Sequence, residues 1–175
     1  MTIELTWLHL DVIARWRNES IGMDIGEFPA DIGYDAERIV YVIRLKRPCY
    51  VEYNNGRSPV CYIGSGRGWR IFTHREGWLA KLPLLLDDFK GYDIKLSKPR
   101  RKGPGNFDAY KVVEADMIRQ FKARYGERPL FNRSLGSGDL KFEYAHSEDV
   151  FGLGSGPGYT VPIKSTQMRR SGLLA

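Results

Sequence analysis

The chain has little cysteine and no long apolar run. Cys49 and Cys61 are its two cysteines, and neither a CxxC pair nor a histidine-rich partner set accompanies them. This excludes a disulfide scaffold and a typical zinc site, and it favours small buried side chains in a reducing cytoplasm. No stretch approaches the roughly 20 apolar residues of a membrane-spanning helix. The start of the chain also lacks the basic region and the cleavage site of a secretory signal. We therefore expect a cytoplasmic protein with no membrane partner.

Charge is distributed unevenly along the chain. The net charge of the 175 residues is +6, but residues 1–36 carry −5 and residues 37–175 carry +11. A basic body of this size suits a polyanionic partner, because lysine and arginine neutralise phosphates and release their counterions. The acidic N-terminal segment could shield part of that basic surface, pack beside it or mediate protein contacts.

Local patterns predict a strand-rich first half. The run RIVYVIRL at residues 38–45 is β-branched and aromatic, which is typical of a central strand. Asn55-Gly56 predicts a turn between the two strands that follow. We expect these further strands at residues 49–53, 60–64, 92–96 and 140–144.

Helical spacing predicts helices at both ends of this strand-rich region. An amphipathic helix is expected from about Thr2 to Arg17, because Leu5, Leu8, Val12 and Trp16 recur at helical intervals. A helix opened by Gly66 and Gly68 should run through Arg70 and His74, and residues 78–86 should form a helical stretch that breaks at Pro83. A longer helix is expected from Asp108 to Tyr125, capped by Asn106 or Asp108 and ended by Gly126.

This order of elements predicts one small α/β or α+β sandwich with extensions. Residues 1–36 would form a helical, acidic extension and residues 37–135 the core. Residues 136–175 would be a glycine-rich extension that packs on the core or trails from it.

Glu114 is the most informative side chain. At about 100° per residue it projects from the middle of the apolar arc of its helix, whereas Asp116 points nearly the opposite way. An ionised carboxylate on a buried face is costly unless a cation or hydrogen-bond donors meet it. A structural ion pair with an arginine is one explanation, and a functional site is the other. The arc comprises Tyr110, Val113, Met117, Ile118, Phe121 and Tyr125.

The context of Glu114 favours a functional site, because several short motifs occur in a known order. Tyr41 lies in IVYVIRL, Tyr62 begins YIG, Arg70 and His74 have RxxxH spacing, Glu114 begins ExxMIxxF, and Asn132 ends YGERPLFN. In this order the motifs resemble the GIY-YIG nuclease superfamily over roughly residues 38–134. The chain departs from the pattern in having Ile39-Val40-Tyr41 as its first motif and a longer connection between the two tyrosine strands.

The resemblance implies a small, mainly antiparallel central sheet flanked by helices, and phosphodiester hydrolysis with one divalent metal ion, Mg²⁺ or Mn²⁺. Glu114 would be the only protein ligand of that ion, and Mg²⁺ often binds through one carboxylate, waters and substrate phosphate. Arg70 would bind the scissile phosphate; a salt bridge is the alternative. Tyr41, or else Tyr62, would orient or deprotonate the attacking water, although both could be core tyrosines.

Two further residues and a basic loop complete the expected site. His74 would orient a tyrosine or a phosphate, or relay a proton, with a structural role as the alternative. Asn132 would brace the site or form a turn. Arg67 could touch phosphate or be solvated surface charge. The loop that carries Lys95, Lys98, Arg100, Arg101 and Lys102 is expected to contact the DNA backbone, or to serve solubility.

These expectations combine into a metal-dependent DNA endonuclease, of restriction type or from a phage or mobile element. One alternative is a non-catalytic nucleic-acid-binding module on the same scaffold. Another is a nuclease that acts on RNA or branched DNA, since the site residues address phosphate rather than base. A single site cuts one strand, so a double-strand break requires a homodimer or sequential nicks.

Overall fold

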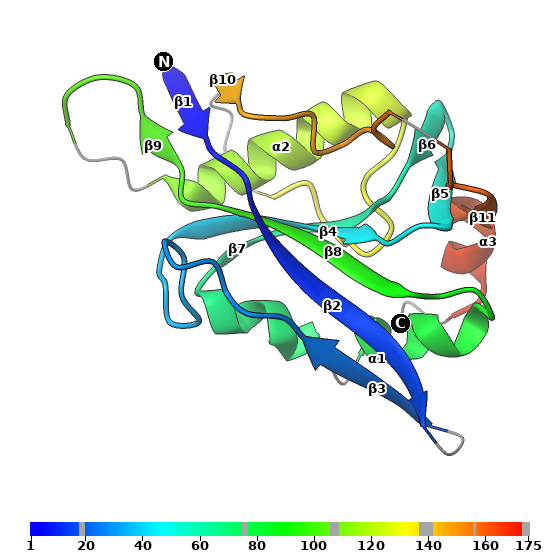
Figure 1. Cartoon of the computed structure of the whole chain (residues 1–175). Helices are drawn as coiled ribbons and strands as arrows, with labels where there is room; N and C mark the ends of the chain where they lie inside the picture. Colours follow the sequence, from blue (N-terminus) through cyan, green and yellow to red (C-terminus); the bar gives the residue numbers. More distant parts are fainter. Residues whose placement is uncertain (18–19, 75–76, 106–108, 137–141, 156, 173–175) are drawn as a thin grey trace.

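The computed structural model describes residues 1–17, 20–74, 77–105, 109–136, 142–155 and 157–172, and a five-stranded antiparallel sheet lies at its centre (Figure 1). The order of its strands is β3 (Ser20–Ile25), β2 (Leu8–Arg17), β8 (Gly91–Ser97), β4 (Ile39–Leu45) and β7 (Val60–Gly66). Every neighbouring pair in this sheet is antiparallel. Strand β4 lies between β8 and β7, and all seven of its residues are buried, as the sequence predicts for a central strand.

Helices cover both faces of this sheet (Figure 1). The long helix α2 (Tyr110–Tyr125) crosses one face over β7 and β4, and the short elements lie on the other. The short elements are η1 (Gly68–His74), α1 (Trp78–Lys81) and η2 (Leu82–Leu85). The fold is therefore mixed α+β with mainly antiparallel strands.

Two three-stranded sheets join distant parts of the chain. In one, β1 (Thr2–Leu5) lies between β10 (Glu143–His146) and β9 (Arg100–Arg101). In the other, β5 (Cys49–Tyr53) lies between β11 (Val161–Lys164) and β6 (Gly56–Ser58). The β1–β10 and β5–β11 pairs are parallel, so the last part of the chain is tied to both sheets, and α3 (Ser165–Arg170) follows it.

Several local predictions are confirmed. The strands expected at residues 49–53, 60–64 and 92–96 are β5, β7 and β8, and the two cysteines are buried and free. The β5–β6 turn lies at residues 54–55, one position before the predicted Asn55-Gly56, because Gly56 already pairs with Tyr53. Helix α1 gives way to η2 next to Pro83, and Gly126 ends α2 with φ +80°. The strand expected at residues 140–144 is β10 from Glu143 onward, and its start lies outside the described residues.

The predicted N-terminal helix is wrong, because residues 2–17 form β1 and β2. Leucines at positions 5 and 8 fit a helical period, but Leu10 and Val12 are buried while His9 before them and Ile13 after them are exposed. That alternation is the period of a half-buried strand. Six register pairs with β8 stabilise it as part of the central sheet, so tertiary pairing overrides the weaker helical signal.

Two helix predictions need adjustment. The segment from Gly68 to His74 is a 3-10 helix, so Arg70 and His74 do not have α-helical geometry. Helix α2 begins at Tyr110, with Ala109 at its N-cap and no side-chain capping bond. The predicted caps, Asn106 and Asp108, lie outside the described residues.

Asp116 is buried, which contradicts its predicted solvent-facing position. Its carboxylate accepts hydrogen bonds from the Tyr144 hydroxyl at 2.8 Å and from the Phe142 backbone N–H at 3.2 Å. The β10 segment therefore covers the face of α2 that helical periodicity assigns to water. Among the described residues, no helix is long and apolar enough to cross a membrane.

We predict that Asp116→Ala lowers the free energy of unfolding by about 2–3 kcal/mol, because it leaves the half-buried Tyr144 hydroxyl and the buried Phe142 N–H without their acceptor. Urea denaturation measures the change. Asp116→Asn retains a carbonyl oxygen and should lose less than half as much. Equal losses in the two variants would show that the acceptor oxygen is not what stabilises this contact.

Candidate active site

Two tyrosines meet across the β4–β7 pair. Tyr41 on β4 lies opposite Gly64 on β7, and the ring centroids of Tyr41 and Tyr62 are 6.1 Å apart. A Cβ atom on Gly64 would lie 2.5 Å from Tyr41 Cζ and 2.7 Å from Tyr62 Cε1, which real Cβ atoms do not tolerate. The glycine of the YIG motif is therefore required here for space, because two phenol rings converge over its backbone.

Both phenols are held in their neutral form. Tyr41 is 1% exposed and Tyr62 is partly buried, and burial is the largest cause of the raised pKa of each hydroxyl. The charge of Glu114 raises both pKa values further, and the charge of Arg70 opposes it. A hydrogen bond between the two hydroxyls raises the pKa of Tyr41 and lowers that of Tyr62.

Glu114 meets the end of β7 from helix α2. The Ser65 hydroxyl donates a short hydrogen bond to Glu114 Oε2. Burial is the largest influence on the pKa of Glu114 and raises it, while Ser65 and the charges of Arg70 and Lys111 lower it in part. The carboxylate is half-buried and only partly compensated, so a further cation beside it would be favourable.

Arg70 comes from the 3-10 helix that follows β7. Gly66 has φ +140°, and a Cβ atom there would lie 2.9 Å from Arg70 Cδ. The arginine stem thus passes close to the end of β7, and the guanidinium group remains exposed. Its charge acts on Tyr41, Tyr62 and Glu114 alike, which places all four groups in one electrostatic cluster.

Asn132 acts on this cluster through the backbone of β7. Its side chain is buried, accepts a hydrogen bond from the Ile63 N–H at 2.9 Å and donates one to the Ile63 carbonyl at 2.8 Å. The Phe131 N–H also donates to the Cys61 carbonyl at 2.9 Å. Residues 131–132 therefore take the place of a further strand along the outer edge of β7. The asparagine holds the residue between Tyr62 and Gly64.

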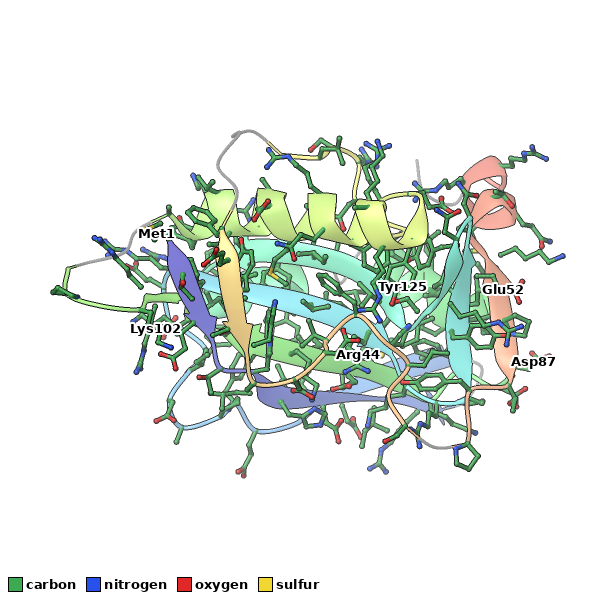
Figure 2. The ribbon with its side chains drawn as sticks, turned by 90° about the horizontal axis from the view of Figure 1, so that it is seen from above. Met1, Arg44, Glu52, Asp87, Lys102 and Tyr125 are labelled. Atoms are coloured by element: carbon green, nitrogen blue, oxygen red, sulfur yellow. The ribbon has the colours of Figure 1, made fainter. Side chains whose placement is uncertain are left out.

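The remaining predicted residues lie in different places. His74 is the last residue of η1, and its side chain lies outside the described part of the chain. Arg67 forms an ion pair with Glu37 at 2.5 Å, and both side chains are more than half exposed. Lys98, Arg100, Arg101 and Lys102 are exposed on and around β9, and Lys102 lies at the same end of the molecule as Met1 (Figure 2).

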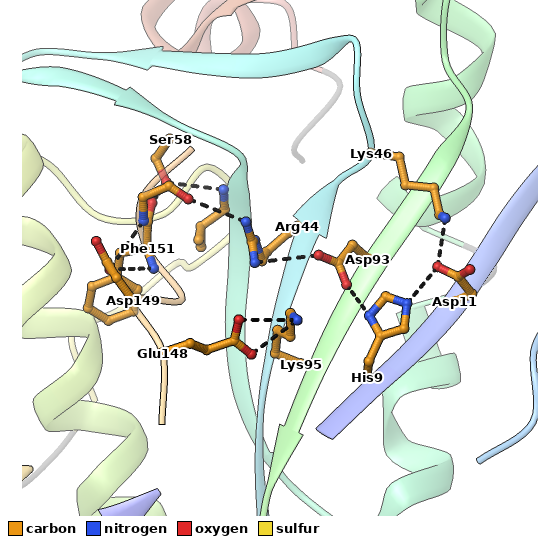
Figure 3. A network of polar contacts seen from close by, with 12 residues as sticks. His9, Asp11, Arg44, Lys46, Ser58, Asp93, Lys95, Glu148, Asp149 and Phe151 are labelled. Carbon is orange, nitrogen blue, oxygen red and sulfur yellow. Dashed lines mark hydrogen bonds and ion pairs between the residues drawn. The ribbon is translucent and has the colours of Figure 1, made fainter. Parts of the chain in front are cut away.

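Lys95 is separated from the other basic residues by its position inside β8. Its ammonium group lies 3.1 Å from Glu148 Oε1, and the side chain is 14% exposed. It belongs to a polar network on the α2 side of the sheet (Figure 3). In that network the His9 ring lies between Asp11 at 3.0 Å and Asp93 at 2.6 Å, and Asp93 also meets Arg44 at 3.4 Å. The charge of Lys95 is therefore compensated within the protein.

Sequence reasoning missed two neighbours of Glu114, Ser65 and Lys111. Ser65 alternates with Tyr62 and Gly64 along β7, so its hydroxyl faces α2 while the tyrosines face the opposite side. The sequence places Ser65 directly after the YIG motif, but that position alone does not show that α2 packs on the face of β7 from which Ser65 projects.

Comparison with known proteins adds no assignment, since no family model, curated protein or solved structure matches the chain.

We predict that the stability of the wild-type protein, relative to Glu114→Gln, falls as pH rises above about 4.5. The unfolded carboxyl has the ordinary pKa of 4.5 and the folded one a higher value, so the folded state holds more protons between the two. The penalty is absent below the unfolded pKa and complete above the folded pKa. Urea denaturation of both proteins between pH 4 and pH 8 measures it. A difference that does not change with pH, or changes in the opposite direction, would contradict a raised pKa.

Proposed function

We propose that this protein is a metal-dependent DNA endonuclease that hydrolyses phosphodiester bonds by a GIY-YIG-type mechanism. One observation carries the proposal: four groups from β4, β7, η1 and α2 meet along residues 64–66 at the end of β7. Tyr41 and Tyr62 pack over Gly64, the Arg70 stem passes Gly66, and Glu114 accepts a hydrogen bond from Ser65. A salt bridge formed only for stability would not need two neutral phenols beside it. The combination of a guanidinium group, a carboxylate and phenols suits attack on a phosphate diester.

Arg70 is the phosphate-binding group in this proposal. Its guanidinium group is exposed, so an incoming phosphate can reach it. Two parallel N–H···O bonds to the non-bridging oxygens would fix the phosphate against the end of β7. The same bonds strengthen as negative charge grows on those oxygens in the transition state, which lowers the barrier.

The two tyrosines have different roles toward the attacking water. Tyr41 is almost fully buried, so it does not meet bulk water, and its hydroxyl shares a hydrogen bond with Tyr62. Tyr62 is the more exposed phenol, so its hydroxyl is the one that solvent and an incoming phosphate can reach. We assign to Tyr62 the contact with the water and to Tyr41 its orientation. A neutral phenol orients water by hydrogen bonding, and the proton leaves toward solvent.

Glu114 would hold the divalent ion. The nearby protein oxygens, those of its own carboxylate and of the Ser65 hydroxyl, are hard donors, which suits Mg²⁺ or Mn²⁺. A cation there would also offset the burial that raises the pKa of Glu114. When bound, the ion supplies positive charge that stabilises the phosphate oxygens and the leaving oxygen. The described residues contain no cluster of three or more histidine, cysteine or acidic ligands, so waters and phosphate would complete the coordination.

The proposed DNA contact outside the site is a basic arm, which we define as Lys98, Arg100, Arg101 and Lys102. These side chains are exposed, and β9 is held by pairing with β1, so the arm presents four positive charges from an anchored ribbon. Lys95 does not belong to the arm, because Glu148 neutralises it. Phosphate contacts of this kind position the duplex without reading its sequence.

Cleavage of supercoiled plasmid in Mg²⁺ tests the proposal. We expect nicked or linear product from the wild-type protein, with rates at least about 100-fold lower for Arg70→Ala and for Glu114→Gln, since each removes charge stabilisation from the transition state. Glu27→Gln removes an exposed carboxylate elsewhere and should cleave at the wild-type rate. Absence of cleavage at any stoichiometry, or equal cleavage by Glu114→Gln, would reject a metal-dependent nuclease.

The salt dependence of DNA binding tests the basic arm. Replacing Lys98, Arg100, Arg101 and Lys102 together with alanine should reduce the slope of log affinity against log salt by about 3–4 units, because about 0.9 counterion is released per phosphate contact. Lys95→Ala should leave the slope unchanged, since its charge is paired with Glu148. Fluorescence anisotropy with a labelled 20-bp duplex in EDTA measures both. A slope that Lys95→Ala reduces as much per charge as the quadruple variant would place the DNA elsewhere.

A further inference from the structure

A cavity of about 360 Å³ opens beside the candidate active site. The turn from β7 into η1 forms one wall, the two residues before the start of β4 form another, and the first residue of α2 closes it. Its side chains are those of Glu37, Arg38, Arg67, Trp69, Arg70 and Tyr110. A volume of this size is within the range of sites that bind small molecules or single nucleotides.

The cavity shares Arg70 with the candidate active site. Arg70 lines the cavity and also acts electrostatically on Glu114 and both tyrosines of the cluster. Tyr110 lies one helical turn before Glu114, so both side chains point to the same side of α2. A ligand in the cavity would therefore lie next to a phosphate held by Arg70.

The lining of the cavity combines positive charge with aromatic faces. It holds three arginines, and Trp69 is 37% exposed, one of few large hydrophobic side chains left open to water among the described residues. Glu37 stands at the rim in an ion pair with Arg67 and offers an acceptor to an exocyclic amine. A phosphate alone would not use the indole, and an apolar ligand would not use the arginines. The lining fits a planar heterocycle attached to an anion, which is a nucleotide.

We propose that this cavity binds one nucleobase of the strand whose phosphate lies against Arg70, with the base stacked on the indole of Trp69. The inference rests on the proposed function and adds a substrate feature to it. Inside a duplex each base is paired and stacked between its neighbours, so the bound base must first leave the stack. The protein would then favour strands with an unpaired base next to the cleaved bond, such as single strands, frayed ends or branch points.

Binding of two single-stranded probes tests the site. Fluorescence anisotropy in EDTA compares a labelled 12-nucleotide mixed-sequence DNA with an abasic deoxyribose phosphate strand of the same length. We expect the wild-type protein to bind the base-bearing strand at least about fivefold more tightly, which is the lower end of the effect of one stacked base. Trp69→Ala should remove that preference and leave the affinity for the abasic strand unchanged.

Two further variants serve as controls. Trp69→Phe keeps an aromatic face and should retain most of the preference, which separates stacking from a folding defect. Tyr159→Ala removes a half-buried aromatic that lies under Arg47, outside the cavity, and should bind both probes as the wild type does.

Equal binding of the two probes by the wild-type protein, or a preference that survives in Trp69→Ala, would overturn the base site even if plasmid cleavage succeeds. Failure to bind either probe at low salt would overturn it as well. A Trp69-dependent preference in a protein that cleaves no plasmid would support the base site while the nuclease proposal fails.

Discussion

The fit of the Tyr41 ring over Gly64 is the constraint on which the rest of the site depends. The two phenol rings can pack together only because residue 64 has no side chain. The register of β4 against β7 puts this glycine opposite Tyr41. Slippage of β4 against β7 by one residue would put the two rings on opposite faces of the sheet. Asn132 prevents this by binding both backbone groups of Ile63 along the edge of β7. The register, the glycine and the asparagine therefore act as one unit.

Helix α2 carries two acids that the fold treats in opposite ways. Asp116 is buried and receives hydrogen bonds from the segment around β10, so its charge is solvated by the protein itself. Glu114 lies two residues earlier and receives a hydrogen bond from Ser65, with Arg70 acting on it only through its charge. The first arrangement stabilises the fold. The second leaves an energetic deficit that a cation can fill, which is the physical reason for locating the chemistry at Glu114 rather than at Asp116.

Local sequence patterns predicted those elements that depend mainly on their own residues. The run at residues 38–45 could only be a central strand, and Gly126 could only end a helix. The N-terminal helix failed because Leu5 and Leu8 fit a helical period whereas Leu8, Leu10 and Val12 fit the period of a strand, and pairing with β8 decided between them. The burial of Asp116 was not predicted, because helical periodicity does not show that residues 142–146 return to cover the far face of α2. Likewise, a run of basic residues does not show that Lys95 faces Glu148 while Lys98 faces water.

The parallel pairing of β1 with β10 and of β5 with β11 ties the beginning of the chain to its end. Contacts between residues so distant in sequence form late, because a long loop must close first. During synthesis, β1 has no strand partner until β9 is made at Arg100–Arg101, and its parallel partner β10 follows only at Glu143–His146. The residues that donate hydrogen bonds to Asp116 on α2, Phe142 and Tyr144, are likewise made only after the helix. The fold is thus complete only after Val161–Lys164 has been made, and until then the unpaired strand edges are surfaces that chaperones can shield.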